Sequence, residues 1–338
     1  MKRQTYRMSR VGSLRRMNLI EDEASPPGPT EVAIDVKAIG LNFADVFTIL
    51  GLYRAAPRRN CVPGIEFSGV VVAVGAEVKD IRVNDRVMGS IRFGAYTTHL
   101  TIDHRYVIRI PEGWSFEEGA SFIVQSLTAY YALVSLGNIQ KGQTVLIHSA
   151  AGGVGLYANR IAKRYSAFTI GTVGNASKIP LLKREGCDRI IVRSAEFKRE
   201  LLAALGGRSL DLVLDAVGGR TQKVSFDALG ATGRLVAYGL SEFASHLATP
   251  NYLRLAWKYL GIPRYHTLRL IEFNKSVLGF NLIWLYDRVE LWRSLLATIG
   301  GLGLERPHVG SVYPFPELKD AIRLLQSGKT TGKVVVSV

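Results

Sequence analysis

Cysteine is scarce in this sequence, since Cys61 and Cys187 are the only two among 338 residues. Two cysteines cannot build a disulfide scaffold, and such low use fits a reducing compartment, so we expect a cytoplasmic protein. Long apolar runs are also missing, because no stretch approaches the roughly 20 residues that span a bilayer. The basic start of the chain lacks the apolar segment of a signal peptide, although an Arg-rich, acid-free start also imitates an organelle transit peptide.

Acidic residues are also few compared with basic residues. The chain has 28 Asp and Glu against 43 Lys and Arg, a formal net charge of +15, and the excess is concentrated in residues 1–16 and 254–275. A basic excess suggests an acidic partner, namely nucleic acid, a membrane surface or a phosphorylated ligand, without choosing among them. The sequence contains no nucleic-acid-binding motif, so we expect no nucleic acid partner.

Metal-binding and hydrolase patterns are absent as well. No two of the six histidines are spaced to share a helix face, and neither cysteine belongs to a C-x-x-C pair. We therefore expect no metal, and we expect His148, at the end of an apolar run, to pack or hydrogen-bond. The absence of a G-x-S-x-G turn removes support for a serine hydrolase.

From about residue 120, apolar runs alternate with helical patterns. Strands are predicted by the runs at 144–149, 168–173, 189–192, 210–216 and 234–238. This alternation predicts an α/β fold with a doubly wound parallel sheet. Short strand patterns before it and mixed structure after it predict that this Rossmann unit is inserted into a β-rich one.

The sequence HSAAGGVG, residues 148–155, follows the first predicted strand and opens a helix. It contains A-x-G-x-x-G, with Ala150, Gly152 and Gly155 at the three fingerprint positions. Gly152 would allow a pyrophosphate to approach the backbone, and Gly155 would allow the helix to pack on the strand. A tight strand-to-helix turn without a ligand is the alternative interpretation.

The end of the next strand favours NADP(H) over NAD(H). An NAD site places Asp or Glu there to bind the ribose 2′-hydroxyl, whereas residues 171–178 read GTVGNASK, without an acid. Asn175, Ser177 and Lys178 would accept a 2′-phosphate. Lys178 as an ordinary surface lysine is the alternative.

Further motifs lie on either side of the turn. They are GLNFAD at 40–45, PGIE at 63–66, NDRV at 84–87, SLTAYY at 126–131 and DAVGG at 215–219. Together with AAGGVG they resemble the zinc-independent medium-chain dehydrogenases/reductases, in particular their quinone oxidoreductase branch. The C-terminal part is most similar to vesicle amine transport protein homologues, and the N-terminal part to polyketide synthase enoyl reductase domains.

The resemblance implies a GroES-like catalytic domain formed by residues 1–122 and 267–338, around an NADPH-binding Rossmann domain of residues 123–266. It also implies a homodimer. The zinc enzymes of the superfamily have G-H-E where this chain has Gly64-Ile65-Glu66, so the resemblance implies that no zinc is bound.

The resemblance also implies site residues. Asn42, Asp45 and Tyr53 would line the nicotinamide and substrate cleft, and Lys178 would face the 2′-phosphate. Pyrophosphate contacts are implied for Thr128, Gly152, Gly153 and Val154, and positions near the nicotinamide for Val217, Gly239, Phe280, Asn281 and Lys333. The chain departs from its relatives at two positions. The relatives often have Tyr near the adenosine phosphate, where this chain has Val192, followed by Arg193. Polyketide enoyl reductases have Gly-Lys where this chain has Gly239-Leu240.

These features predict an NADPH-dependent oxidoreductase that transfers hydride to a quinone or to the C=C bond of an α,β-unsaturated carbonyl. Tyr53 is the candidate donor of a proton and a hydrogen bond, because its phenol is neutral at pH 7. The alternative is that Tyr53 only shapes the cleft. Asn42 and Asp45, three residues apart on a helical turn, are expected to orient ribose or substrate. Asp215 is expected to cap the Val-Gly-Gly turn that follows it.

Two alternatives remain open. One is a reductase of enoyl thioesters on CoA or on an acidic carrier protein. The other is a membrane-associated protein that binds NADPH with little catalysis. Residues 252–260, YLRLAWKYL, have the composition of a membrane-surface helix and equally that of a helix over the substrate mouth.

Overall fold

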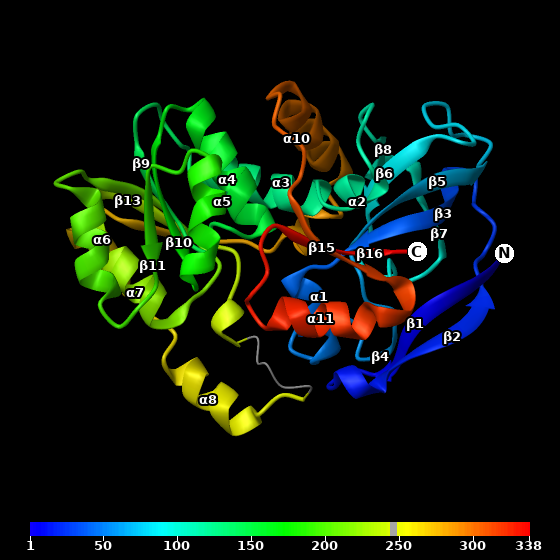
Figure 1. Ribbon diagram of the computed structural model, residues 1–338, viewed down its shortest axis with the longest axis horizontal. Helices are drawn as coiled ribbons and strands as arrows, with labels where there is room; N and C mark the ends of the chain where they lie inside the picture. Colours follow the sequence, from blue (N-terminus) through cyan, green and yellow to red (C-terminus); the bar gives the residue numbers. More distant parts are fainter. Residues whose placement is uncertain (244–248) are drawn as a thin grey trace.

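The computed structural model describes residues 1–243 and 249–338 and contains two large sheets with helices between and around them (Figure 1). The sheet at the left of Figure 1 is built from the middle of the chain, and the sheet at the right from its two ends. Helices α3 (Ile123–Tyr130) and α10 (Val289–Gly301) lie between the two sheets in this view.

The middle of the chain forms a six-stranded sheet in the order β11-β10-β9-β12-β13-β14, with all neighbouring strands parallel. Its strands are β9 (Thr144–Ile147), β10 (Phe168–Val173), β11 (Arg189–Val192), β12 (Leu210–Asp215), β13 (Leu229–Ala237) and β14 (Ser276–Gly279). The first five are connected by α4 (Gly153–Arg164), η4 (Ala176–Lys178), α5 (Ile179–Arg184), α6 (Phe197–Leu205) and α7 (Gly219–Ala228). Strand order therefore reverses between β9 and β12, as in a doubly wound sheet. The predicted fold class is confirmed.

The last strand of this sheet lies beyond residue 266, where the sequence predicted the Rossmann part to end. Strand β14 pairs in parallel with β13, with Val277 opposite Leu235 and Gly279 opposite Ala237. Helices α8 (Tyr252–Leu260) and α9 (Thr267–Glu272) lie in the connection between the two strands. The chain leaves the sheet only after Gly279, so a division between 266 and 267 cuts through it. Four residues, SVLG, are too short to show a strand pattern of their own.

The two ends of the chain form a seven-stranded sheet in the order β15-β16-β3-β5-β6-β8, with β7 pairing with β3. Its strands are β3 (Glu31–Gly40), β5 (Glu66–Val74), β6 (Arg86–Ser90), β7 (His99–Asp103), β8 (Val107–Arg109), β15 (Val309–Pro314) and β16 (Lys333–Ser337). Strand β16 pairs antiparallel with β3, with Val335 opposite Gly40. The last residues of the chain thus complete a sheet that the N-terminal part begins.

A smaller sheet, in the order β2-β1-β4, lies beside the N-terminus. Its strands are β1 (Lys2–Arg10), β2 (Met17–Glu23) and β4 (Arg59–Cys61). The remaining helices are α1 (Phe43–Ile49), α2 (Phe116–Gly119), α11 (Leu318–Gln326) and the short η1 (Leu14–Arg16), η2 (His104–Tyr106), η5 (Ser241–Phe243), η6 (Leu282–Leu285) and η7 (Phe315–Glu317).

Helices α2 and α3 and a π-helical turn, η3 (Tyr131–Leu136), form one apolar run from Phe116 to Leu136. By length and composition alone this run is able to cross a membrane, so the expectation that no such run exists is wrong. Its most apolar window is 72 % buried, and every residue of α3 is buried, which is the pattern of a core helix. In this fold the run carries side chains to the site between the two sheets.

Candidate functional site

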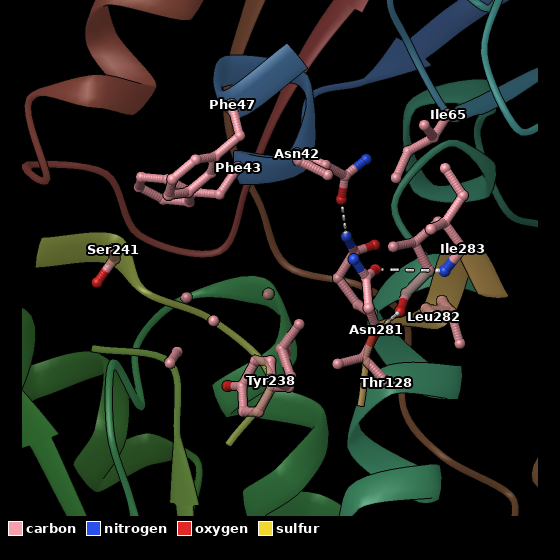
Figure 2. Close-up of a pocket in the computed structure, with 18 of the residues that line it drawn as sticks. Asn42, Phe43, Phe47, Ile65, Thr128, Tyr238, Ser241, Asn281, Leu282 and Ile283 are labelled. Carbon is pink, nitrogen blue, oxygen red and sulfur yellow. Dashed lines mark hydrogen bonds between the residues drawn. The ribbon is translucent and has the colours of Figure 1, made fainter. Parts of the chain in front are cut away.

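A cavity of about 610 Å³ lies between the two sheets and is lined from both (Figure 2). Its upper side in Figure 2 includes Phe43 and Phe47 of α1, and its lower side includes Tyr238, which follows β13. The cavity joins segments that are far apart in the sequence. The predicted site residues that line it are Asn42, Tyr53, Thr128, Gly152, Gly153, Val154, Gly155, Gly239, Phe280, Asn281 and Lys333.

The turn between β9 and α4 exposes its backbone to this cavity. A Cβ atom on Gly155 would lie 2.5 Å from the Cα of Ala150, and one on Gly153 would lie 2.7 Å from the Cγ of Gln125, so neither position admits a side chain. A Cβ atom on Gly152 would meet only the carbonyl oxygen of Ser149, at 3.3 Å. The cavity side of the turn is therefore open at the N-terminus of α4, where free N–H groups favour a phosphate. Ala150 is buried behind the turn.

Two cations lie beyond the ends of β10 and β11, because Lys178 ends η4 and Arg193 comes after β11. The Lys178 Nζ donates to the carbonyl oxygen of Gly328 at 2.7 Å, and Arg193 donates to the hydroxyl of Thr172 at 3.1 Å. Burial, and then the charge of Arg193, lowers the pKa of Lys178. Among the described residues, neither cation forms an ion pair with a carboxylate. Arg193 directly follows β11. Its position after a predicted strand can be read from the sequence, but the sequence alone indicates no role for it in cofactor binding.

Asn175 is placed differently from Lys178. It is exposed, and its side-chain oxygen accepts the backbone N–H of Ser177 at 2.8 Å, so it caps η4. Neither Asn175 nor Lys178 lines the cavity as it stands. The two residues flank the end of β10, beyond the Gly-rich turn.

The histidine at the end of β9 is a core residue. The Nδ1 of His148 lies 2.9 Å from the Thr172 hydroxyl, and its Nε2 lies 2.9 Å from the Ser225 hydroxyl. Burial and the nearby charge of Arg193 lower the pKa of His148 to about 3, so its ring is neutral. The hydrogen-bonding role predicted for His148 is confirmed.

A buried ion pair forms the back wall of the cavity. The Lys333 Nζ, on β16, lies 2.6 Å from Glu66 Oε2, on β5, and 2.8 Å from Asn42 Oδ1. The same Asn42 oxygen accepts the amide of Gln125 at 2.7 Å, and the Asn42 amide group donates to the Gly40 carbonyl at 3.0 Å. Figure 2 shows the Asn42 end of this network. Asn42 lines the cavity, but its side chain is held by protein partners.

Tyr53 and Asn281 both line the cavity and are in contact with each other. The Tyr53 hydroxyl donates to Asn281 Oδ1 at 2.8 Å. The same oxygen accepts the backbone N–H of Ile283 at 3.4 Å (Figure 2). Burial raises the pKa of Tyr53 to about 12, so the phenol is neutral and carries a proton at physiological pH. Phe280, next to Asn281, packs edge-on against Tyr131 with ring centroids 5.1 Å apart. The two predicted residues Tyr53 and Asn281 thus form one contact.

Asp45 does not face the cavity. Its Oδ2 accepts the backbone N–H of Asn42 at 2.8 Å, and its own N–H donates to the Asn42 carbonyl at 3.0 Å, so it caps the start of α1. The side chain is 1 % exposed, and burial raises the pKa of its carboxyl to about 7. The expectation that Asp45 orients ribose or substrate is therefore corrected to a structural role in α1.

The turn after β12 is also held by a carboxylate. Asp215 Oδ1 accepts the backbone N–H groups of Val217 at 2.8 Å and Gly218 at 3.2 Å, which confirms the predicted cap. Val217 is buried and does not line the cavity, whereas Ala216 does. Leu240, at the position of the lysine in polyketide enoyl reductases, lines the cavity beside Gly239 and supplies no proton donor.

In residues 1–243 and 249–338, no group of three or more His, Cys, Asp or Glu side chains is arranged to hold a metal ion. Ile65 lies at the position of the zinc-ligating histidine in the zinc enzymes of the superfamily, and its side chain lines the cavity (Figure 2).

Comparisons with known proteins agree with this architecture. Residues 28–112 match the model of the alcohol dehydrogenase GroES-like domain, and residues 186–336 match the model described as zinc-binding dehydrogenase. The human synaptic vesicle membrane protein VAT-1 homolog is 34 % identical over 335 residues, which are 96 % of this chain and 84 % of that protein.

Two solved structures are similar over almost the whole chain. The CurK enoyl reductase has a TM-score of 0.84 and 29 % identity, covering 99 % of both chains. The Escherichia coli quinone oxidoreductase, solved as a complex with NADPH, has a TM-score of 0.82 and 27 % identity, covering 99 % of this chain and all of its own.

Together, the fold and these likenesses place the protein among the medium-chain dehydrogenases/reductases. Within that superfamily the chain belongs to the zinc-independent, quinone oxidoreductase-like family, whose members are oxidoreductases and bind NADP(H).

The buried ion pair gives a stability prediction. Replacing Lys333 with Met leaves the carboxylate of Glu66 buried without its cation, so we expect the free energy of unfolding to fall by about 3–5 kcal/mol. Urea denaturation of wild type and Lys333→Met measures the change. Lys329→Met is the matched control, because Lys329 is exposed on the loop before β16 and its loss should matter by less than about 0.5 kcal/mol.

A second variant separates the lost charge from the lost packing. Glu66→Gln combined with Lys333→Met removes both charges, so it should recover much of the stability that the single variant loses. A double variant as unstable as Lys333→Met would contradict this account of the pair.

Proposed function

We propose that this protein is an NADPH-dependent reductase of quinones or of the C=C bond of α,β-unsaturated carbonyl compounds. The observation that carries the proposal is the single cavity that runs from the open Gly-rich turn to the hydroxyl of Tyr53. One end of the cavity suits a dinucleotide, and the other is an apolar compartment with a neutral donor. The quinone oxidoreductase and enoyl reductase likenesses support the same reaction class.

The residues present fit NADPH better than NADH. The Gly152 turn would hold the pyrophosphate, while Lys178 and Arg193 would face the 2′-phosphate, at a strand end that has no acid to pair with a 2′-hydroxyl. Thr128, Phe280 and Asn281 line the part of the cavity where the nicotinamide would lie. When bound, NADPH supplies the hydride for reduction of an electron-poor acceptor.

The protein's own contribution is a proton and a hydrogen bond. An unsaturated carbonyl develops negative charge on oxygen as it is reduced, and a neutral phenol next to that oxygen stabilises the charge. The Tyr53 hydroxyl is held by Asn281 at the cavity wall and keeps its proton at neutral pH. A quinone needs less of this help. We therefore assign Tyr53 as the donor, whose role matters most for enones and enoyl thioesters.

Assembly and location are part of the proposal. Strand β14 is the last strand in the order of its sheet, and an open sheet edge is a natural site for pairing with a second copy of the chain. Phe273, before β14, and Trp284, after it, are 47 % and 58 % exposed. These features support a homodimer. The low cysteine content supports a cytoplasmic location.

A membrane surface is the second candidate partner, because α8 exposes its apolar side chains. Tyr252, Leu253 and Trp257 are 70 %, 80 % and 76 % exposed, and α8 lies at the lower margin of the molecule in Figure 1. Aromatic and aliphatic side chains on an exposed basic helix suit the interface of an anionic membrane. The human relative is named a membrane protein, which supports this candidate.

The reaction is tested by following NADPH oxidation with a quinone, a 2-alkenal and an enoyl-CoA. We expect turnover with at least one acceptor, and a preference identifies the substrate class. Tyr53→Phe should lower kcat for the alkenal by roughly a hundredfold to a thousandfold, and less for the quinone, because one oxyanion donor is lost. Tyr259→Phe, at a side chain on α8 that is 66 % exposed, is the control. No turnover with any acceptor would refute the proposed activity.

The cofactor assignment is tested by Lys178→Ala and Arg193→Ala. Each should raise the Kd for NADPH by roughly tenfold to a hundredfold, because a hydrogen bond to a charged phosphate is lost, while the Kd for NADH changes little. Fluorescence titration measures both constants. Arg189→Ala, an exposed arginine at the opposite end of β11, serves as the control. Equal losses for NADPH and NADH would disprove a 2′-phosphate site here.

Membrane association is tested by flotation with vesicles of phosphatidylserine and phosphatidylcholine. Wild type should float with them, and Trp257→Glu should reduce the floating fraction several-fold, since it places a charge on the apolar surface of α8. Leu202→Glu, on α6 and 53 % exposed in wild type, is the control. Wild-type protein that stays at the bottom of the gradient eliminates the membrane candidate.

A further inference from the structure

The acceptor side of the cavity contains a cation that the proposed reaction does not use. Arg92 lies in the loop after β6 and lines the cavity together with Ile91, Leu282 and Ile283. None of the described residues that line the cavity is an Asp or Glu. The other lining cation, Lys333, is neutralised by Glu66 behind it. Arg92 is therefore the positive charge that an acceptor in this part of the cavity would meet.

Arg92 is held at this position from a distant part of the chain. Its guanidinium donates to Asp287 Oδ2 at 2.7 Å, and its Cζ lies 5.8 Å from the ring centroid of Tyr286. The Asp287 side chain is 67 % exposed and the Arg92 side chain is 38 % exposed. An ion pair with so solvated a carboxylate leaves most of the guanidinium's attraction for a second anion intact. Arg92 Nε has no hydrogen-bond acceptor among the described residues.

The surroundings of Arg92 would strengthen its attraction for an anion. Phe93, the next residue, packs edge-on against Tyr53 with ring centroids 6.3 Å apart. Against the larger effect of burial, which raises the pKa of the Tyr53 phenol, the charge of Arg92 lowers it. On the cavity side, Ile91, Leu282 and Ile283 would exclude water from an anion bound to Arg92, so that pair would be screened less than the solvated pair with Asp287. The guanidinium is also planar, so it binds a carboxylate or phosphate through two parallel hydrogen bonds.

We propose that Arg92 selects acceptors that carry an anionic group, a carboxylate or a phosphate, on an otherwise apolar body. The anionic group would pair with Arg92 while the reducible bond lies beside Tyr53, which fixes the orientation of the acceptor in the cavity. This inference rests on the proposed reductase activity and narrows it, because a simple neutral quinone or alkenal would leave Arg92 unused.

The test compares two pairs of acceptors that differ in the anionic group. One pair is a long-chain 4-oxo-2-alkenoic acid and its methyl ester, and the other is an enoyl-phosphopantetheine and the enoyl-pantetheine of the same acyl chain. The value of kcat/KM is measured by NADPH oxidation for wild type, Arg92→Gln, Arg92→Lys and Arg293→Gln. Arg293, on α10, is 48 % exposed, lies 3.7 Å from Asp80 and does not line the cavity, so it is the matched control for a lost surface charge.

Wild type should prefer the anionic member of at least one pair by about tenfold or more in kcat/KM. Arg92→Gln should abolish that preference mainly through KM, lowering kcat/KM for the anionic acceptor much more than for the neutral one. Arg92→Lys should keep part of the preference, and Arg293→Gln should keep all of it. A preference in the first pair identifies a carboxylate, and one in the second identifies a phosphate.

Three results would overturn the inference and are distinguishable from failure of the reductase proposal. Wild type that reduces the neutral acceptors but shows no preference in either pair has no anion subsite. A preference that survives in Arg92→Gln places the subsite elsewhere. Turnover with the quinone or the 2-alkenal but with none of these four acceptors also overturns the inference and leaves the reductase activity standing. Absence of turnover with every acceptor, the quinone and the 2-alkenal included, refutes the reductase activity, and with it the inference that rests on it.

Discussion

The cavity depends on the buried ion pair between Glu66 and Lys333. The two residues are 267 positions apart, and their contact links β16 to β5 across the intervening strand β3. Burial disfavours both charges, and it lowers the pKa of Lys333 while Glu66 opposes that shift. The pair is tolerated because its remaining polar atoms have partners. Glu66 Oε1 accepts the backbone N–H of Val124 at 2.9 Å, in the first turn of α3, where the helix dipole favours a negative charge.

This network decides which side chains are left to meet ligands. The Asn42 oxygen accepts hydrogen bonds from Lys333 and Gln125, so Asn42 acts as a rigid part of the wall. The side chain of Asp45 accepts the backbone N–H of Asn42 and thereby caps the start of α1. The groups left to meet ligands are the backbone at the Gly152 turn, the guanidinium of Arg92 and the hydroxyl of Tyr53, whose single O–H would have to turn from Asn281 to an acceptor oxygen. The geometry thus separates a structural polar core from the polar groups that can take part in binding and proton transfer.

The sequence predicted the parts of the fold and site that local patterns determine. The apolar run before AAGGVG predicted both strand β9 and the open turn, and Asp215 before Val-Gly-Gly predicted its cap. Contacts between distant residues could not be read in this way. Nothing local shows that Tyr53 meets Asn281, 228 residues later, or that Asp287 holds Arg92. Asp45 misled for the same reason, because three-residue spacing on a helical turn fits a cap as well as a site.

The distribution of positive charge separates structural from functional cations. The basic N-terminal segment is partly neutralised within its own sheet, where Arg3 and Arg7 both pair with Asp22. In the second basic segment, Arg269 pairs with Asp227, and Lys275 donates to the carbonyl oxygen of Asp227. The cations around the proposed ligand sites belong to neither segment, because Lys178 ends η4, Arg193 follows β11 and Arg92 lies in the loop after β6. Net charge therefore relates to solvation and surface attraction in this fold, whereas the proposed anion recognition rests on cations that lack a buried carboxylate partner.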